Sequence, residues 1–246
     1  MSDLRDFYTA GYAESDARTA TRLGEWRALG AEGKANHVLA LVGPAPRGVV
    51  ELGCGDGALL AALARRGWRG LTGFELSPTA AALAAGLGVA TVEAYDGERV
   101  PRDDGAFDLA IVSHVLEHVT DPQALLAEAA RVARRVVVEV PLEGNRSARR
   151  PAKAAEARAI GHIQAFTRAD VAALAAGCGL RVERELSDPL GLRHHAFFAA
   201  DRPTRAVAAA KWGAKWTAWR LRPLEAERWF TVHYAALLSP RGRSGS

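Results

Sequence analysis

The sequence predicts an α/β fold in which helices cover both faces of a parallel sheet. Short apolar segments alternate with segments of helical spacing along most of the chain. The apolar segments are hydrophobic throughout instead of alternating with polar residues, which is typical of parallel strands buried on both faces. The chain has 246 residues, of which 49% are hydrophobic and 24% charged, so it can bury a full core without disulfides or metals.

The helices and strands are expected in the following order. Helical spacing covers residues 3–43, with an interruption near Gly30–Gly33, and Gly43-Pro44 ends it. Strands are predicted at residues 49–52, 70–76, 89–93, 107–113, 135–140, 180–186 and 231–238. Helices are predicted at residues 58–66, 78–85, 122–134 and 169–176, with Ser77, Asp121 and Thr167 as N-caps. A basic helix at residues 204–222 carries Trp212, Trp216 and Trp219 on one face.

We expect these elements to form one domain over residues 1–246. Its parts are an N-terminal helical cap (1–43), a ligand-binding core (44–186), a basic, tryptophan-rich helical insertion (187–230), the last strand (231–238) and a tail (239–246). Because the insertion lies between the last two strands, we expect its indoles to cover a substrate pocket, in preference to a membrane surface or a nucleic acid.

Charge is distributed unevenly along the chain. The net charge of +4 combines −6 over residues 1–145 with +10 over residues 146–246. The basic second half indicates either an anionic partner or a solvated arginine-rich surface. The two cysteines, Cys54 and Cys178, suit a reducing compartment. The polar N-terminus has no secretory signal, and the longest small-apolar stretch, residues 80–92, is too short to span a bilayer, so we expect a cytoplasmic protein with no membrane partner.

A glycine-rich turn follows the first predicted strand. The segment Glu51-Leu52-Gly53-Cys54-Gly55-Asp56-Gly57 differs from the dinucleotide pattern, whose third glycine would stand at Ala58. An acid at the first position leaves room for a charged amino-acid group, whose ammonium needs a carboxylate nearby. Glu75, at the end of the second strand, suits both hydroxyls of a ribose, although NAD enzymes of similar layout use an acid in the same way.

These residues, together with Phe107-Asp108 through Leu116-Glu117-His118 to Pro122, resemble the motifs of the class I S-adenosylmethionine (SAM) methyltransferases. The resemblance covers roughly residues 35–186. Within this class, the segment is similar to the broad group that includes the ubiquinone-biosynthesis-type O-methyltransferases. It implies a Rossmann-like, seven-stranded, mostly parallel sheet with a helical cap inserted before the last strand. The usual Leu-Lys-Pro-Gly-Gly turn before the fifth strand is replaced by Ala133-Arg134-Arg135, on the face remote from the site.

The resemblance also implies the cofactor and its binding residues. SAM would be the methyl donor and S-adenosylhomocysteine (SAH) the product. The residues expected to bind the cofactor are Glu51, Gly53, Cys54, Gly55, Gly57, Glu75, Leu76, Asp96, Ser113 and, on the N-terminal helix, Tyr12. Asp96 would meet the adenine amino group, with a role in a Tyr-Asp-Gly turn as the alternative.

Histidines are the strongest candidates for chemistry. His162, before the Phe166-Thr167 helix start, is the first candidate for the general base, and His114 is the second. Glu117 and His118 are expected to border the acceptor. A His-x-x-Glu-His spacing can also bind a metal, and the related enzymes have Glu-x-x-Glu-His at this place. Because His114 takes the first position here, a hard ion that prefers oxygen ligands is disfavoured, and no metal is expected.

The acceptor is expected to be a small molecule that receives the methyl group on oxygen or, less favourably, on nitrogen. Arg146 and Arg149 border the expected pocket and would suit an anionic acceptor, unless their loop is mobile and solvated. A nucleic-acid methyltransferase is less favoured, because the Asn/Asp-Pro-Pro-Tyr/Phe type of motif is missing. A protein that keeps the fold and binds SAM without turnover is also less favoured. An NAD dehydrogenase is less favoured because this chain lacks the glycine spacing of the dinucleotide pattern.

Overall fold

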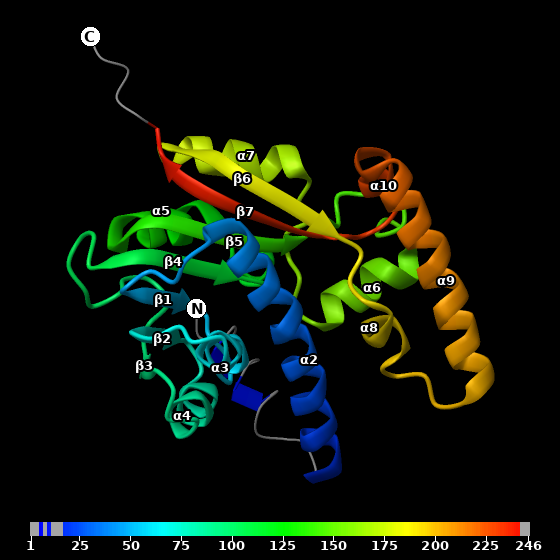
Figure 1. Ribbon diagram of the computed structural model, residues 1–246, viewed down its shortest axis with the longest axis horizontal. Coiled ribbons are helices and arrows are strands. Elements are labelled where there is room, and N and C mark those ends of the chain that lie inside the picture. The colour runs from blue at the N-terminus through cyan, green and yellow to red at the C-terminus, as the bar shows by residue number, and fades with distance from the viewer. Residues whose placement is uncertain (1–4, 7–8, 11–16, 242–246) are drawn as a thin grey trace.

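The computed structural model describes residues 5–6, 9–10 and 17–241, and its centre is a seven-stranded sheet (Figure 1). The strands are β1 (Val49–Leu52), β2 (Leu71–Glu75), β3 (Thr91–Ala94), β4 (Phe107–Ser113), β5 (Ala133–Pro141), β6 (Leu180–Asp188) and β7 (His233–Pro240). Their order across the sheet is β3-β2-β1-β4-β5-β7-β6. β7 runs antiparallel to both of its neighbours, β5 and β6, and the other described pairs of strands are parallel. The predicted fold class is therefore confirmed.

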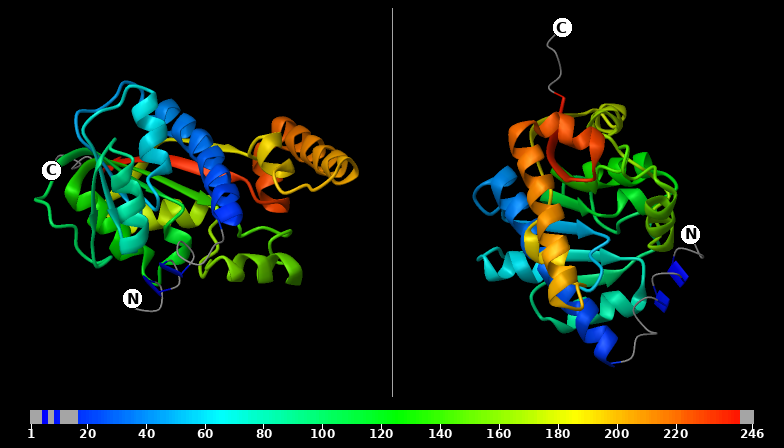
Figure 2. Two further views of the ribbon diagram at one scale, coloured as in Figure 1. Left: turned by 90° about the horizontal axis from the view of Figure 1, so that it is seen from below. Right: turned by 90° about the vertical axis from the view of Figure 1, so that its right-hand side faces the viewer.

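Helices cover both faces of the sheet (Figures 1 and 2). The described helices are α2 (Ala17–Val42), α3 (Ala58–Arg65), α4 (Pro78–Gly86), α5 (Pro122–Val132), α6 (Pro151–Ala159), α7 (Arg168–Gly177), α8 (Leu192–Ala196), α9 (Arg202–Leu221) and α10 (Pro223–Trp229), with a 3-10 helix, η1, at Leu116–His118. Helices α2 and α3 pack on one face and α5 and α7 on the other. Neighbouring residues of β1 divide between the two cores, Val49 on the α2 side and Val50 on the α5 side. This division explains why the strand is apolar throughout.

Local sequence signals position several helix starts as predicted. Ser77 and Asp121 accept hydrogen bonds from the backbone N–H groups of Ala80 and Ala124 and so cap α4 and α5. Thr167 caps α7 in a capping box with Asp170. Ser77 lies two residues after the end of β2, so its cap contributes to the shape of the edge where ligands bind in this fold.

The N-terminal helix differs from the prediction. We expected an interruption near Gly30–Gly33, but α2 is continuous through both glycines. A glycine inside a helix costs only about 1 kcal/mol relative to alanine. The buried face of α2, with Ala31, Ala35 and Val38, packs on the sheet and offsets this cost.

Some element boundaries also differ from the predictions. The third strand is Thr91–Ala94 and not residues 89–93, and β5 starts at Ala133, so α5 ends two residues earlier than expected. The basic segment between β5 and His162 contains a helix, α6, that the sequence analysis did not predict. None of the described helices combines the length and the apolar character that crossing a membrane requires.

The insertion before the last strand forms three helices, α8, α9 and α10, and α9 extends along one side of the molecule (Figures 1 and 2). The indole N–H groups of Trp212 and Trp219 donate hydrogen bonds to the Leu190 carbonyl oxygen, at 2.9 Å, and to the Ser187 hydroxyl oxygen, at 3.4 Å. Trp216 is 41% exposed. Trp212 and Trp219 therefore fix α9 to the end of β6 and the chain that follows it. Our expectation that the tryptophans cover the substrate pocket is wrong, because no residue of α9 lines it.

Candidate functional site

A large cavity opens at the carboxyl ends of the parallel strands. Its volume is about 940 Å³, which lies near the upper end of the usual range for small-molecule sites. The ends of β1, β2, β4 and β5, the first residue of β7 and the cavity-facing side of α2 all contribute to its wall. The sheet order reverses between β1 and β4, which is where ligands bind in open α/β sheets.

The glycine-rich turn after β1 forms one end of this cavity. Gly53 and Gly55 have φ angles of 75° and 55°, in the left-handed region that favours glycine. A Cβ atom on Gly53 would lie only 2.6 Å from Cγ2 of Val115. Gly57 does not line the cavity, and a Cβ atom there would lie 2.9 Å from that of Ala84. Gly53 and Gly55 therefore let a ligand approach the backbone, whereas Gly57 lets α3 pack on α4.

Glu51 is buried in the cavity wall, and its Oε2 atom has no hydrogen-bond partner in the part of the chain that the structure describes. It is 4% exposed, and burial raises the pKa of its carboxyl group to about 8. A ligand ammonium beside this carboxylate would offset that cost. The amino-acid part of SAM carries such an ammonium, so Glu51 and the two glycines fit this cofactor.

Glu75 lies at the end of β2, where the sequence predicts contact with the ribose. Its two carboxylate oxygens accept hydrogen bonds from the backbone N–H groups of Gly55 and Ser77, each at 2.8 Å. Glu75 therefore also holds the glycine-rich turn against β2. Ionised carboxylates keep further acceptor capacity when they accept two such bonds, so the role toward ribose hydroxyls stays open to it.

The remaining predicted cofactor residues fall into two groups. Cys54, Leu76 and Ser113 line the cavity, and burial raises the pKa of the Cys54 thiol, which is thus an inert packing group. Asp96 is exposed and accepts hydrogen bonds from the backbone N–H groups of Glu98 and Arg99, so it forms the turn that we gave as its alternative role. Tyr12 lies outside the described residues.

His162 lines the cavity and is paired with an acidic side chain. Its Nδ1 atom lies 2.7 Å from Oε2 of Glu143, and its ring meets that of His118 edge to face. Burial opposes the charged imidazole, but the hydrogen bond to Glu143 and the charges of Glu143 and Glu117 together outweigh it and raise the pKa of His162. A carboxylate on Nδ1 orients the ring and leaves Nε2 as the atom that can take a proton.

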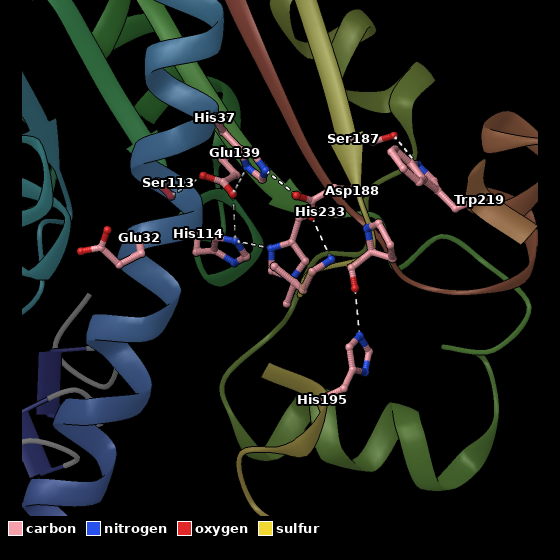
Figure 3. Close-up of polar contacts among 12 residues, drawn as sticks. Glu32, His37, Ser113, His114, Glu139, Ser187, Asp188, His195, Trp219 and His233 are labelled. Carbon is pink, nitrogen blue, oxygen red and sulfur yellow. Dashed lines mark hydrogen bonds and ion pairs between the residues drawn. The ribbon is translucent and has the colours of Figure 1, made fainter. Parts of the chain in front are cut away.

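His114 lies in a second group of histidines on the cavity floor (Figure 3). Its backbone has a φ angle of 57°, unusual for a residue other than glycine. Its Nε2 atom lies 3.0 Å from Nδ1 of His233. Burial lowers the pKa of both imidazoles far below the usual value, so both rings are neutral.

A buried carboxylate accompanies this histidine pair. Glu139, 1% exposed, accepts hydrogen bonds from His37 Nδ1 at 3.0 Å and from the Ser113 hydroxyl at 3.1 Å. His37 also donates to Asp188, at 2.8 Å. Burial lowers the pKa of His37, but these two carboxylates outweigh it and raise that pKa to about 10, so His37 is charged.

The predicted acceptor residues are only partly brought together. His118 lines the cavity and its Nδ1 atom donates to the Gly161 carbonyl oxygen at 3.0 Å. Glu117 is buried behind the cavity wall, with Oε1 3.0 Å from His114 Nδ1. Arg146 and Arg149 are exposed and do not line the cavity, and Arg146 stacks on Trp229. The three candidates for a metal fall into two separate groups of potential ligands, His114 in one and Glu117 and His118 in the other.

The residues of the cavity wall that sequence reasoning missed include Lys34, Glu139, Glu143 and His233. Glu143 could have been predicted from the sequence, since it follows the fifth strand at the edge where parallel strands end. His233 could also have been predicted, because the first residue of an antiparallel strand lies at that same edge. Lys34 comes from the helix that we expected to break near it.

Known proteins show what class of protein has this fold and site. Residues 25–185 match the family described as methyltransferase domain, so the chain belongs to that family. Ajmaline N-methyltransferase from Rauvolfia serpentina is 32% identical over 95 residues, a match that covers 36% of this chain and 33% of that enzyme. The chain thus matches only about a third of the length of this curated relative.

Solved structures agree in fold. A SAM-dependent methyltransferase from Thermotoga maritima superposes with a TM-score of 0.63 at 16% identity, covering 95% of this chain and 98% of that one. Geranyl diphosphate C-methyltransferase from Streptomyces coelicolor, in complex with SAH, has a TM-score of 0.62 at 16% identity and coverages of 85% and 79%. The chain therefore belongs to the methyltransferase domain family and has the fold of SAM-dependent methyltransferases.

Proposed function

We propose that the protein transfers the methyl group of SAM to a small molecule that gives up a proton, on oxygen first and on nitrogen second. SAM supplies a methyl group that is already activated, so the protein has to align the acceptor and exclude water. The observation that supports this proposal is the His162–Glu143 pair, which lines the same cavity as Glu51, Gly55 and Glu75. His162 would accept the proton of the acceptor at Nε2.

We propose an uncharged or cationic acceptor instead of an anionic one. The anionic alternative depends on Arg146 and Arg149, which lie outside the cavity lining. Among the described residues, the lining contains seven acidic side chains and only two basic ones, Arg27 and Lys34. Arg27 is already paired with Asp56. The name of the plant relative, an N-methyltransferase, is compatible with an amine acceptor.

The first experiment is calorimetric titration with SAH, with NAD as the control ligand. Micromolar binding of SAH without binding of NAD supports the donor site. Transfer of a labelled methyl group is then measured with phenols, amines and carboxylates of similar size. Preferential labelling of carboxylates would contradict the proposed acceptor class.

The same experiment distinguishes two competing functions, because each predicts a different result. SAH binding without transfer to any acceptor would favour a binding protein that has kept the fold. Labelling of RNA that weakens steeply with salt would favour a nucleic-acid methyltransferase. Both outcomes would contradict methylation of a small molecule.

A further inference from the structure

Side chains from three strand ends converge on the cavity floor. His114 follows the end of β4, Glu139 lies near the end of β5 and His233 begins β7 (Figure 3). All three line the cavity. Strand ends are rigid supports, so the positions of these groups relative to one another are set by the pairing of β4, β5 and β7.

The three residues place their donor atoms close together. Nε2 of His114 lies 3.0 Å from Nδ1 of His233 and 3.9 Å from Oε1 of Glu139. One ligand atom from each residue lies within 4.8 Å of the other two. Two nitrogens bound to one tetrahedral zinc ion at the usual bond lengths lie about 3.4 Å apart. The histidine pair needs only a small separation to reach this geometry, and the carboxylate needs to approach by about half an ångström.

Each donor has a polar partner behind it. Glu139 is held by His37 and Ser113, and His37 is held in turn by Asp188 (Figure 3). Glu117 lies 3.0 Å from Nδ1 of His114. The negative charge of Glu117 favours the proton of His114 on Nδ1, which leaves the lone pair of Nε2 facing His233. Carboxylates behind ligating histidines, and hydrogen bonds to ligating carboxylates, are typical of metal sites.

Charge in this part of the molecule also favours a cation. Glu117 and Glu139 are each 1% exposed, and the charged His37 and Asp188, which hydrogen-bond to each other, offset one another in charge. Among the described residues, neither carboxylate oxygen of Glu117 has a hydrogen-bond partner, since its short contact with His114 is not aligned as one. Buried carboxylates without a full set of partners are expensive unless a cation lies close to them.

We propose that His114, Glu139 and His233 bind a divalent transition-metal ion on the floor of the cavity. The ligand set of two imidazoles and one carboxylate suits zinc, iron or cobalt, in contrast to magnesium, which prefers oxygen ligands. The ion takes the place of the proton that the two histidines share. Its remaining coordination position faces the cavity, because all three ligands line it.

A neighbouring group, Glu117, His118 and His162, could also hold an ion. Two observations favour the first group over this one. Glu117 does not line the cavity, and His162 is already oriented by Glu143 as a base. The two groups share no residue, so substitutions distinguish them.

The ion would bind the oxygen or nitrogen of the acceptor and favour its deprotonated form. This role depends on the proposed function, whereas binding of the ion does not. The two inferences therefore fail independently: a protein that binds the ion but methylates nothing would contradict only the proposed function.

The experiment measures metal content in the full chain, purified without a histidine tag. After incubation with zinc and extensive dialysis, one equivalent per chain is expected by mass spectrometry of the metal. Replacement by cobalt is expected to give the visible absorption of a four- or five-coordinate site with nitrogen ligands. A chain that retains less than about a tenth of an equivalent would overturn the proposal.

Substitutions then assign the ligands. His233→Gln and Glu139→Gln are each expected to weaken zinc affinity at least 100-fold in competition with a chelating dye, which corresponds to the loss of one ligand. His195→Gln is the matched control, because His195 donates to the Pro189 carbonyl oxygen outside the cavity lining and its substitution should leave zinc affinity unchanged. Retained SAH binding shows that each variant is folded. Loss of zinc in His162→Gln with full retention in His233→Gln would overturn the assignment in favour of the neighbouring group.

Discussion

Glu75 supports the fold, and we expect it to bind the cofactor as well. It accepts hydrogen bonds from Gly55 and Ser77 and lines the cavity at the same time. Glu75→Ala is expected to weaken SAH binding at least tenfold, because a charge-assisted hydrogen bond to the ribose and the support of the turn are both lost. Calorimetric titration measures this affinity. Glu183→Ala, at an exposed carboxylate of β6, is the control, and equal affinities of the two variants would remove Glu75 from the donor site.

His162 provides a prediction that depends on pH. It faces Glu143, His118 and Glu117, and its pKa is raised, mainly by the hydrogen bond to Glu143 against the effect of burial. A base must be neutral to act, so the rate should fall as the pH drops through this raised pKa. Glu143→Gln removes the group that stabilises the charged ring, and the acidic limb of the pH–kcat profile should move to lower pH.

The matching substitution at the base itself separates chemistry from binding. His162→Ala is expected to lower kcat about 100-fold or more, the usual contribution of a general base, with unchanged SAH affinity. Steady-state kinetics with the identified acceptor measure this effect. An unchanged pH–kcat profile in His162→Ala would assign the acidic limb to another group.

At the scale of an element, α2 shows that packing can outweigh local propensity. Gly33 lies inside this helix, and a Cβ atom there would have no neighbour within 4 Å. Gly33→Ala is therefore expected to stabilise the protein by up to about 1 kcal/mol. Chemical denaturation measures the free energy of unfolding. Gly57→Ala is the contrasting variant, since its φ angle of 78° and its contact with Ala84 predict a loss of stability.

The sequence analysis succeeded where a local pattern sets the structure. The apolar strands, the N-caps at Ser77, Asp121 and Thr167, and the glycine-rich turn are each defined within a few residues. It failed where distant segments decide. Helix α6 was not predicted, and the position of α9 depends on contacts such as the hydrogen bond from the Trp212 indole N–H to the Leu190 carbonyl oxygen, which no short pattern contains.

At the scale of the whole molecule, the topology assembles the cavity floor. His114 and His233 are 119 positions apart in the chain, and only the antiparallel entry of β7 beside β5 brings them within 3.0 Å. A sequence can indicate that histidines follow strands, but their pairing requires the strand order. This is why the motif residues Glu51 and Glu75 could be predicted and the pair with His233 could not.

The whole molecule should also respond to the cofactor. The cavity wall combines α2, through Trp26 and Lys34, with the ends of the central strands, so a ligand there contacts elements far apart in the sequence. SAH at 100 times its dissociation constant adds about 2.7 kcal/mol to the free energy of unfolding. For a chain of this size each kcal/mol raises Tm by about 2–4 °C, so a shift of about 5–10 °C is expected. Scanning calorimetry measures Tm, NAD at the same concentration is the control, and a similar shift with NAD would contradict the donor site defined by Glu51.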